Sequence, residues 1–171
     1  MLSFTSNLNP KSDAFAVFVT DKYTYNNKNN ILSNRVIHRI NSFLKVLKVK
    51  NEKEEISFFD INDQQKCFII KVKNKYENYY PEEIGGMFFS QLKKLKIINT
   101  IDLYSDSLNQ DKEKLAKFFS EFIFGFNLKS YTFNKYKTLN KEKINKKINF
   151  KIITSHKRKI ENNYKYYDAI K

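Results

Sequence analysis

The stretch Leu115–Thr138, LAKFFSEFIFGFNLKSYTFNKYKT, decides the fold expected for this chain. Its first half carries a single apolar stripe at helical spacing, made of Leu115, Phe118, Phe119, Phe122, Ile123 and Phe126. Each aromatic side chain can remove roughly 150–250 Å² from water, so this stripe must face a core. Gly125 forms a small-residue break, and residues 130–136 then alternate as an extended segment does. The stretch therefore predicts an aromatic core helix that leads into an extended segment.

Strands and helices alternate along the rest of the chain. Hydrophobic periodicity predicts strands at residues 13–20, 55–60, 66–73, 97–104 and 147–154, and helices at 31–49, 81–96 and 156–171. The polar turn at residues 62–65 favours a hairpin or adjacent strands on either side of it. The lysines in the last strand favour a place at the edge of the sheet. This order predicts a three-layer α/β/α sandwich, with a mixed or largely parallel sheet between helices.

The helix ends carry capping signals. Ser107, with Gln110 three residues later, is a candidate cap for the aromatic helix, and Ser155 for the last helix. Glu113 and Lys117 have the spacing of an ion pair on the exposed face of the aromatic helix. No Gly, Asn or Pro closes the last helix, so we expect Lys171 to be a cut in a longer chain.

Size and composition indicate one globular domain. The chain has 171 residues and a formal net charge of +14, with a sequence pI near 9.6. Residues 138–171 hold ten Lys or Arg against three acids, so this tail of +7 carries half of the excess charge. The sole cysteine, Cys67, lies in an apolar run, which favours a buried thiol in a reducing compartment. The N-terminus resembles no signal peptide and no run of about 18 apolar residues occurs, so we expect a cytoplasmic protein without a membrane partner.

The sequence predicts no catalytic, cofactor-binding or metal-binding residue in this chain. His38, His156 and Cys67 fall in three different elements, and no metal, nucleotide or nucleophile motif occurs. The neighbouring acids Glu54–Glu55 and Glu82–Glu83 cannot face one another within a strand or helix, which argues against a catalytic carboxylate pair.

Gly85 and Gly86 invite two interpretations. Glycines at a helix start can let a phosphate approach backbone N–H groups, but no further glycine pattern accompanies this pair. We favour close packing of the helix on the sheet, because glycine has no side chain to hold the two elements apart.

The basic tail His156–Lys171 is the strongest binding candidate in the sequence. Aromatic residues interleaved with Lys and Arg can stack bases and follow phosphates. However, Ile160, Tyr164, Tyr167 and Ile170 repeat at helical spacing and are expected to point inward. Lysine is also abundant throughout the chain. A structural helix is therefore favoured, and nucleic-acid binding remains the alternative.

A resemblance to a known family adds to these inferences. The string Gly125-x-x-Leu128-x-x-Tyr131-x-Phe133-x-x-Tyr136-Lys137-Thr138, the Lys-rich linker, the strand KINFKIIT and the terminal helix resemble, in that order, the N-terminal domain of the cytosolic leucyl aminopeptidases. Three residues depart from the family pattern: Phe124 stands where an acid is frequent, Phe126 where a small residue is common, and Asn134 where Asp is usual. These departures concern the packing of the helix.

The resemblance implies a specific organisation. It implies a macro-domain-like fold with a domain core at residues 1–138, a Lys-rich linker and edge strand at 139–154, and the start of a connecting helix at 155–171. The two divalent metals, zinc or manganese, would lie in a C-terminal catalytic domain absent from this chain. This chain would then cleave no peptide itself, and its partners would be that catalytic domain and further copies in a hexamer. A basic nucleic-acid-binding module and a stand-alone scaffold are the alternatives.

Overall fold

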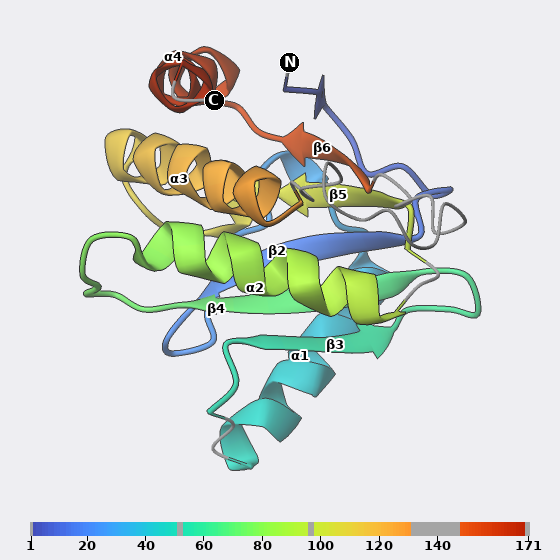
Figure 1. Ribbon diagram of the computed structural model, residues 1–171. Helices are drawn as coiled ribbons and strands as arrows, with labels where there is room; N and C mark the ends of the chain where they lie inside the picture. The colour runs from blue at the N-terminus through green and yellow to red at the C-terminus, as the bar shows by residue number, and fades with distance from the viewer. Residues whose placement is uncertain (1, 51–52, 96–97, 131–147, 170–171) are drawn as a thin grey trace, which may run out of the picture.

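The computed structural model describes residues 2–50, 53–95, 98–130 and 148–169 (Figure 1). The strands are β1 (Phe4–Thr5), β2 (Ala14–Thr20), β3 (Ile56–Asp60), β4 (Lys66–Val72), β5 (Thr100–Tyr104) and β6 (Asn149–Ile153). The α-helices are α1 (Asn34–Val49), α2 (Tyr80–Leu95), α3 (Lys112–Ser130) and α4 (Lys157–Asp168). Two short 3-10 helices, η1 (Lys28–Asn30) and η2 (Ser105–Ser107), complete the set of described elements.

The strands form one mixed sheet in the order β1-β6-β5-β2-β4-β3. All neighbouring pairs are parallel except β3 and β4, which form the antiparallel hairpin that the sequence favoured. Strand β2 lies at the centre, where Phe15 is in register with Cys67 of β4 and with Asp102 of β5. Six of its seven side chains are apolar and buried, because helices cover both faces of the sheet.

Helices occupy the two faces of the sheet unequally. Helices α2, α3 and α4 lie side by side on one face, and α1 lies on the other (Figure 1). Two buried clusters result, one beneath the three helices and one between α1 and the sheet. The predicted three-layer α/β/α sandwich is therefore confirmed.

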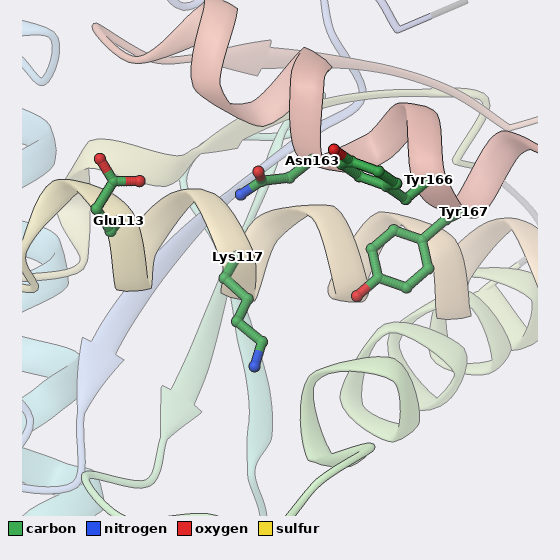
Figure 2. Close-up of a pocket in the computed structure, with 5 residues that line it drawn as sticks. All are labelled: Glu113, Lys117, Asn163, Tyr166 and Tyr167. Atoms are coloured by element: carbon green, nitrogen blue, oxygen red, sulfur yellow. The ribbon is translucent and has the colours of Figure 1, made fainter.

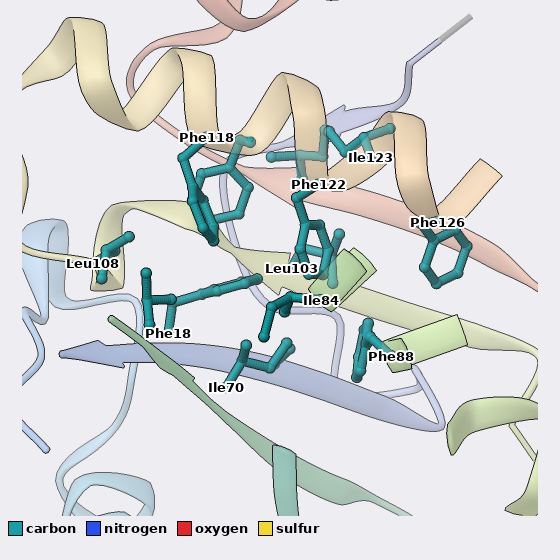
Figure 3. Packing of buried hydrophobic residues seen from close by; sticks show 14 of the residues in the cluster. Phe18, Ile70, Ile84, Phe88, Leu103, Leu108, Phe118, Phe122, Ile123 and Phe126 are labelled. Carbon is teal, nitrogen blue, oxygen red and sulfur yellow. The ribbon is translucent and has the colours of Figure 1, made fainter. Parts of the chain in front are cut away.

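The aromatic stripe of α3 forms the centre of the larger cluster. Phe119 and Phe122 are 0% exposed and Phe126 is 2% exposed, as the periodicity predicted. The ring of Phe18, from the central strand, meets Phe119 edge-on at a centroid distance of 4.6 Å. It meets Phe122 in the same way at 5.3 Å (Figure 3). Such edge-to-face pairs stabilise a core beyond the area that they bury. The interpretation of the stripe as a core helix is confirmed.

Gly125 does not break this helix. Helix α3 continues to Ser130, and a Cβ atom on Gly125 would lie 2.0 Å from the carbonyl oxygen of Glu82 in α2. A Cβ atom on Gly85 of α2 would lie 2.0 Å from the carbonyl oxygen of Phe122 in α3. The glycines therefore allow two helices to cross closely, and the expected contact of Gly85 with the sheet was wrong. Of the extended segment expected at residues 130–136, Ser130 is still helical, and the rest lies outside the described residues.

Strand β6 lies inside the sheet, between β1 and β5, so its expected place at the edge was wrong. The edge is formed by β1, whose two residues pair with Ile152 and Ile153. A two-residue strand leaves too little alternation for a sequence pattern to detect. Helix α4 continues the same layer, because Ile160 and Tyr164 are buried against the cluster around α3. The start of the expected connecting helix is thus packed on the sandwich.

Both capping predictions were wrong. Helix α3 begins after Asp111, whose carboxylate accepts hydrogen bonds from the backbone N–H groups of Glu113 and Lys114. Ser107 lies in η2, where its hydroxyl donates to the carbonyl of Tyr104 and accepts from the N–H of Phe18. Helix α4 begins after His156 without a side-chain cap. The Ser107 hydroxyl is thus engaged by η2 and β2, and the Ser155 hydroxyl lies next to the ring of His156.

Candidate functional site

A ligand-binding site in this fold is expected first at the carboxyl ends of the parallel strands. In open α/β sheets, ligands bind beyond these ends, where connections leave the sheet in opposite directions. Here that point lies between β2 and β5, since the chain leads from β2 to β4 on one side and returns to β5 on the other. Residues 21–33 and 105–111 follow these two strands.

These two connections are hydrogen-bonded to one another. The N–H of Asn26 donates to the carbonyl of Ser107 at 2.8 Å, and the Asn26 side chain donates to the side-chain oxygen of Asn109 at 3.1 Å. The hydroxyl of Tyr104 donates to the carbonyl of Lys28 at 2.8 Å. Burial, and next the neighbouring Asp106, raise the pKa of Tyr104 to about 12, so its phenol stays neutral at physiological pH. The side chains of Asn26, Asn109 and Tyr104 are thus engaged within the protein, whereas the buried Oε1 of Gln110 has no hydrogen-bond partner among the described residues.

Asp106 is the most buried acid at this edge, and its role is structural. Its carboxylate accepts from the hydroxyls of Ser105 and Thr154 and, at 2.7 Å, from the backbone N–H of Ser155. The Ser155 hydroxyl lies 3.2 Å from His156 Nε2, which superficially suggests a catalytic triad. A triad would require the carboxylate to orient the imidazole, whereas this one holds the backbone that leads into α4. Asp106 therefore joins η2 to the end of β6.

The residues considered for chemistry in the sequence stay apart. His38 is exposed on α1, His156 lies before α4, and Cys67 is buried in β4. Burial raises the pKa of the Cys67 thiol well above its usual range, which keeps the sulfur protonated and unreactive. Among the residues that the structure describes, no three His, Cys, Asp or Glu side chains form a group able to hold a metal ion.

A shallow groove lies between α3 and α4 (Figure 2). It has a volume of about 400 Å³ and is lined by Glu113, Lys117, Asn163, Tyr166 and Tyr167. Glu113 forms an ion pair with Lys159 of α4, and Lys117 lies 3.8 Å from Glu121, so the predicted pair of Glu113 with Lys117 was wrong. Tyr166, which lies outside the predicted stripe, is 78% exposed, whereas Tyr164 within the stripe is buried. These solvated side chains offer a contact surface and no enclosed binding site.

Glu121 of α3 and Glu82 of α2 both interact with Tyr167, which lines the groove. The hydroxyl of Tyr167 donates to Glu121 at 3.1 Å, which ties α4 to α3. Burial, and next Glu121, raise the pKa of Glu82 on α2. Burial and the same two acids raise the pKa of Tyr167 to about 12. The ionisable groups of α2, α3 and α4 therefore influence one another at this junction. They do not identify a substrate.

A surface that the sequence analysis overlooked is the outer side of α1. Arg35, Arg39, Lys45 and Lys48 are all exposed there, and residues 34–50 contain no acid. The charge balance of each predicted helix was readable from the sequence, but only the fold shows that, among the described helices, α1 is the one that covers its face of the sheet. The described part of the chain has no helix long and apolar enough to cross a membrane.

Comparisons with known proteins reveal similarity of fold. No protein-family model and no curated protein matches the sequence. Among solved structures, a tomato leucine aminopeptidase mutant matches with a TM-score of 0.65 and 12% identity, over 99% of this chain and 36% of the aminopeptidase chain. A macrodomain mutant from Oceanobacillus iheyensis matches with a TM-score of 0.55 and 11% identity, over 99% of this chain and 93% of the macrodomain. The chain thus has a macro-domain-like fold and spans about a third of the aminopeptidase's length.

Proposed function

We propose that this chain is a non-catalytic N-terminal domain of a leucyl aminopeptidase, in which the complete enzyme would release N-terminal amino acids from peptides. The observation that carries the proposal is the match to the tomato enzyme, which includes nearly all of this chain but only 36% of that one. The TM-score for this match exceeds that for the macrodomain, although the macrodomain is close to this chain in length. The order of motifs around Tyr131–Thr138 supports the same assignment.

The metal-dependent reaction would require ligands such as Asp, Glu and Lys converging on two ions, and the described part of this chain presents no such group of acids, histidines or cysteines. In this proposal the zinc or manganese ions are bound by a C-terminal catalytic domain. The domain described here shapes the oligomer, up to a hexamer, and access to its active sites in the cytoplasm.

The test begins with the gene. The transcript is sequenced beyond the codon for Lys171, and the complete product is purified and assayed on leucine anilide with zinc or manganese. We expect the reading frame to continue into a catalytic domain, and the product to hydrolyse the anilide as an oligomer in light-scattering measurements. A stop codon directly after Lys171 would show a stand-alone scaffold and refute the proposal. A longer product that is inactive with both metals would refute it as well.

A further inference from the structure

We infer that the outer side of α1 binds the phosphate backbone of nucleic acid without regard to base sequence. This inference is independent of the proposed peptidase assembly, because it rests on the charges of α1 alone. Sequence composition pointed to the basic tail as the nucleic-acid candidate. The structure favours the opposite face of the sheet.

The charge of α1 is distinct from that of the other helices. Residues 34–49 contain four cations and no acid, whereas α2 has two of each, and α3 and α4 each have four cations and two acids. A general excess of lysine would raise the positive charge of every helix, but it does not explain the lack of acids in α1. On α4, moreover, Lys159 is engaged by Glu113. The positive surface of α1 is therefore the least compensated among the described helices.

The four cations of α1 are spread over its exposed surface, with Arg39 and Lys48 on opposite flanks of the helix. Arg35 and Lys48 are 13 residues apart, which corresponds to about 20 Å along the helix axis. Arg39 is held in place by donating to the backbone carbonyl of Asp60 at 2.8 Å. The carboxylate of Asp60 is paired with Lys66, so it does not neutralise the arginine. Cations spread over a length of about 20 Å suit a polyanion whose charges repeat along its length.

The remaining side chains of this surface favour nucleic acid over a lipid surface. A helix that lies on a membrane inserts an apolar stripe, but the stripe of α1, formed by Ile40, Leu44 and Leu47, is buried against the sheet. The outer side instead presents polar groups that can bond to phosphate and sugar oxygens: Asn34, His38 and Asn41. Exposed apolar side chains occur in its last turns, at Val46 and Val49.

The experiment compares two variants with equal charge. One carries Arg35→Gln, Lys45→Gln and Lys48→Gln on α1, and the control carries Arg158→Gln, Lys165→Gln and Lys129→Gln, all exposed on α3 and α4. Binding to a fluorescent 20-base-pair DNA duplex is titrated at several salt concentrations. Thermal unfolding by circular dichroism verifies that both variants remain folded.

We expect the wild-type chain to bind the duplex with an affinity that falls steeply with salt. The α1 variant should bind at least about tenfold more weakly at 100 mM salt, with a log–log salt slope reduced by about 2.7, since each phosphate contact contributes about 0.9. The control should stay within about twofold of wild type. No binding at 50 mM salt, or an equal loss in both variants, would overturn the inference.

Two competitors distinguish other anionic partners. Vesicles rich in phosphatidylserine and polyglutamate of matched charge are added to the wild-type complex with labelled duplex. If the surface recognises a nucleic-acid backbone, unlabelled duplex competes at least about tenfold better than either. If vesicles or polyglutamate compete as well as the duplex, the partner is a lipid surface or an acidic protein and the inference is wrong.

Discussion

The missing Cβ atoms of two glycines allow α2 and α3 to approach closely. The backbone of each helix occupies the space where the other helix's glycine would carry a side chain, at Gly85 and at Gly125. Gly86, the neighbour of Gly85, does not share this constraint, because a Cβ atom there would find its nearest neighbours at 3.7 Å. Two adjacent glycines that look alike in the sequence therefore have different roles.

Replacing Gly125 by alanine should destabilise the protein. The added methyl group would meet the carbonyl of Glu82, and we expect a loss of about 2–3 kcal/mol in the free energy of unfolding because the helices must move apart. Gly86→Ala is the matched control and should gain about 0.5–1 kcal/mol, since alanine favours a helix interior. Urea unfolding measures both. Equal stability of the two variants would show that the close crossing is not present.

At the scale of elements, one buried carboxylate joins parts that are distant in sequence. Asp106, between β5 and α3, receives hydrogen bonds from Thr154 and Ser155, almost 50 residues later. On the other side of the strand, Asp102 accepts from the N–H of Asn9 at 2.7 Å and holds the N-terminal segment. Burial raises the pKa of Asp102, while the bonds from Asn9 and Ser12 oppose that rise. Asp102 thus joins β5 to the segment around Asn9, and Asp106 joins η2 to the residues that follow β6.

The junction of α2, α3 and α4 should make stability depend on pH. Burial and Glu121 raise the pKa of Glu82 in the folded protein. Its contribution to stability is therefore present below the unfolded value of about 4.3 and is lost as pH rises through the folded pKa. Relative to Glu82→Gln, wild type should lose about 0.5 kcal/mol between pH 4 and 7, a small effect because solvent screens a partly exposed pair.

Urea unfolding at several pH values measures this difference. Glu83→Gln is the matched control, because it removes the same charge from the same helical turn at an exposed position. Wild type and Glu82→Gln with parallel pH profiles would contradict the prediction.

At the scale of the whole molecule, the centre and edges of the sheet should differ in local stability. Strand β2 is hydrogen-bonded on both sides and buried on both faces, whereas β1 has two half-buried residues at the edge. Backbone amides of β2 should exchange hydrogen only on global unfolding, and those of β1 through local opening, at least about 100-fold faster. Hydrogen exchange followed by mass spectrometry tests this. Equal protection of β1 and β2 would show that the edge strand belongs to the cooperative core.

The sequence by itself determined the fold class, the buried face of α3 and the hairpin of β3 and β4, because hydrophobic periodicity is a local property of the chain. It also contained the charge imbalance of α1. Only the tertiary structure decided that β6 lies inside the sheet and that Gly125 packs against the backbone of α2. It also decided that the Asp106 carboxylate accepts a hydrogen bond from the N–H of Ser155. These features depend on contacts between residues far apart in the chain, and spacing along a sequence does not specify which distant groups meet. The fold also shows that the cations of α1 are exposed on a helix without acids. The candidate surface is therefore α1 and no longer the basic tail.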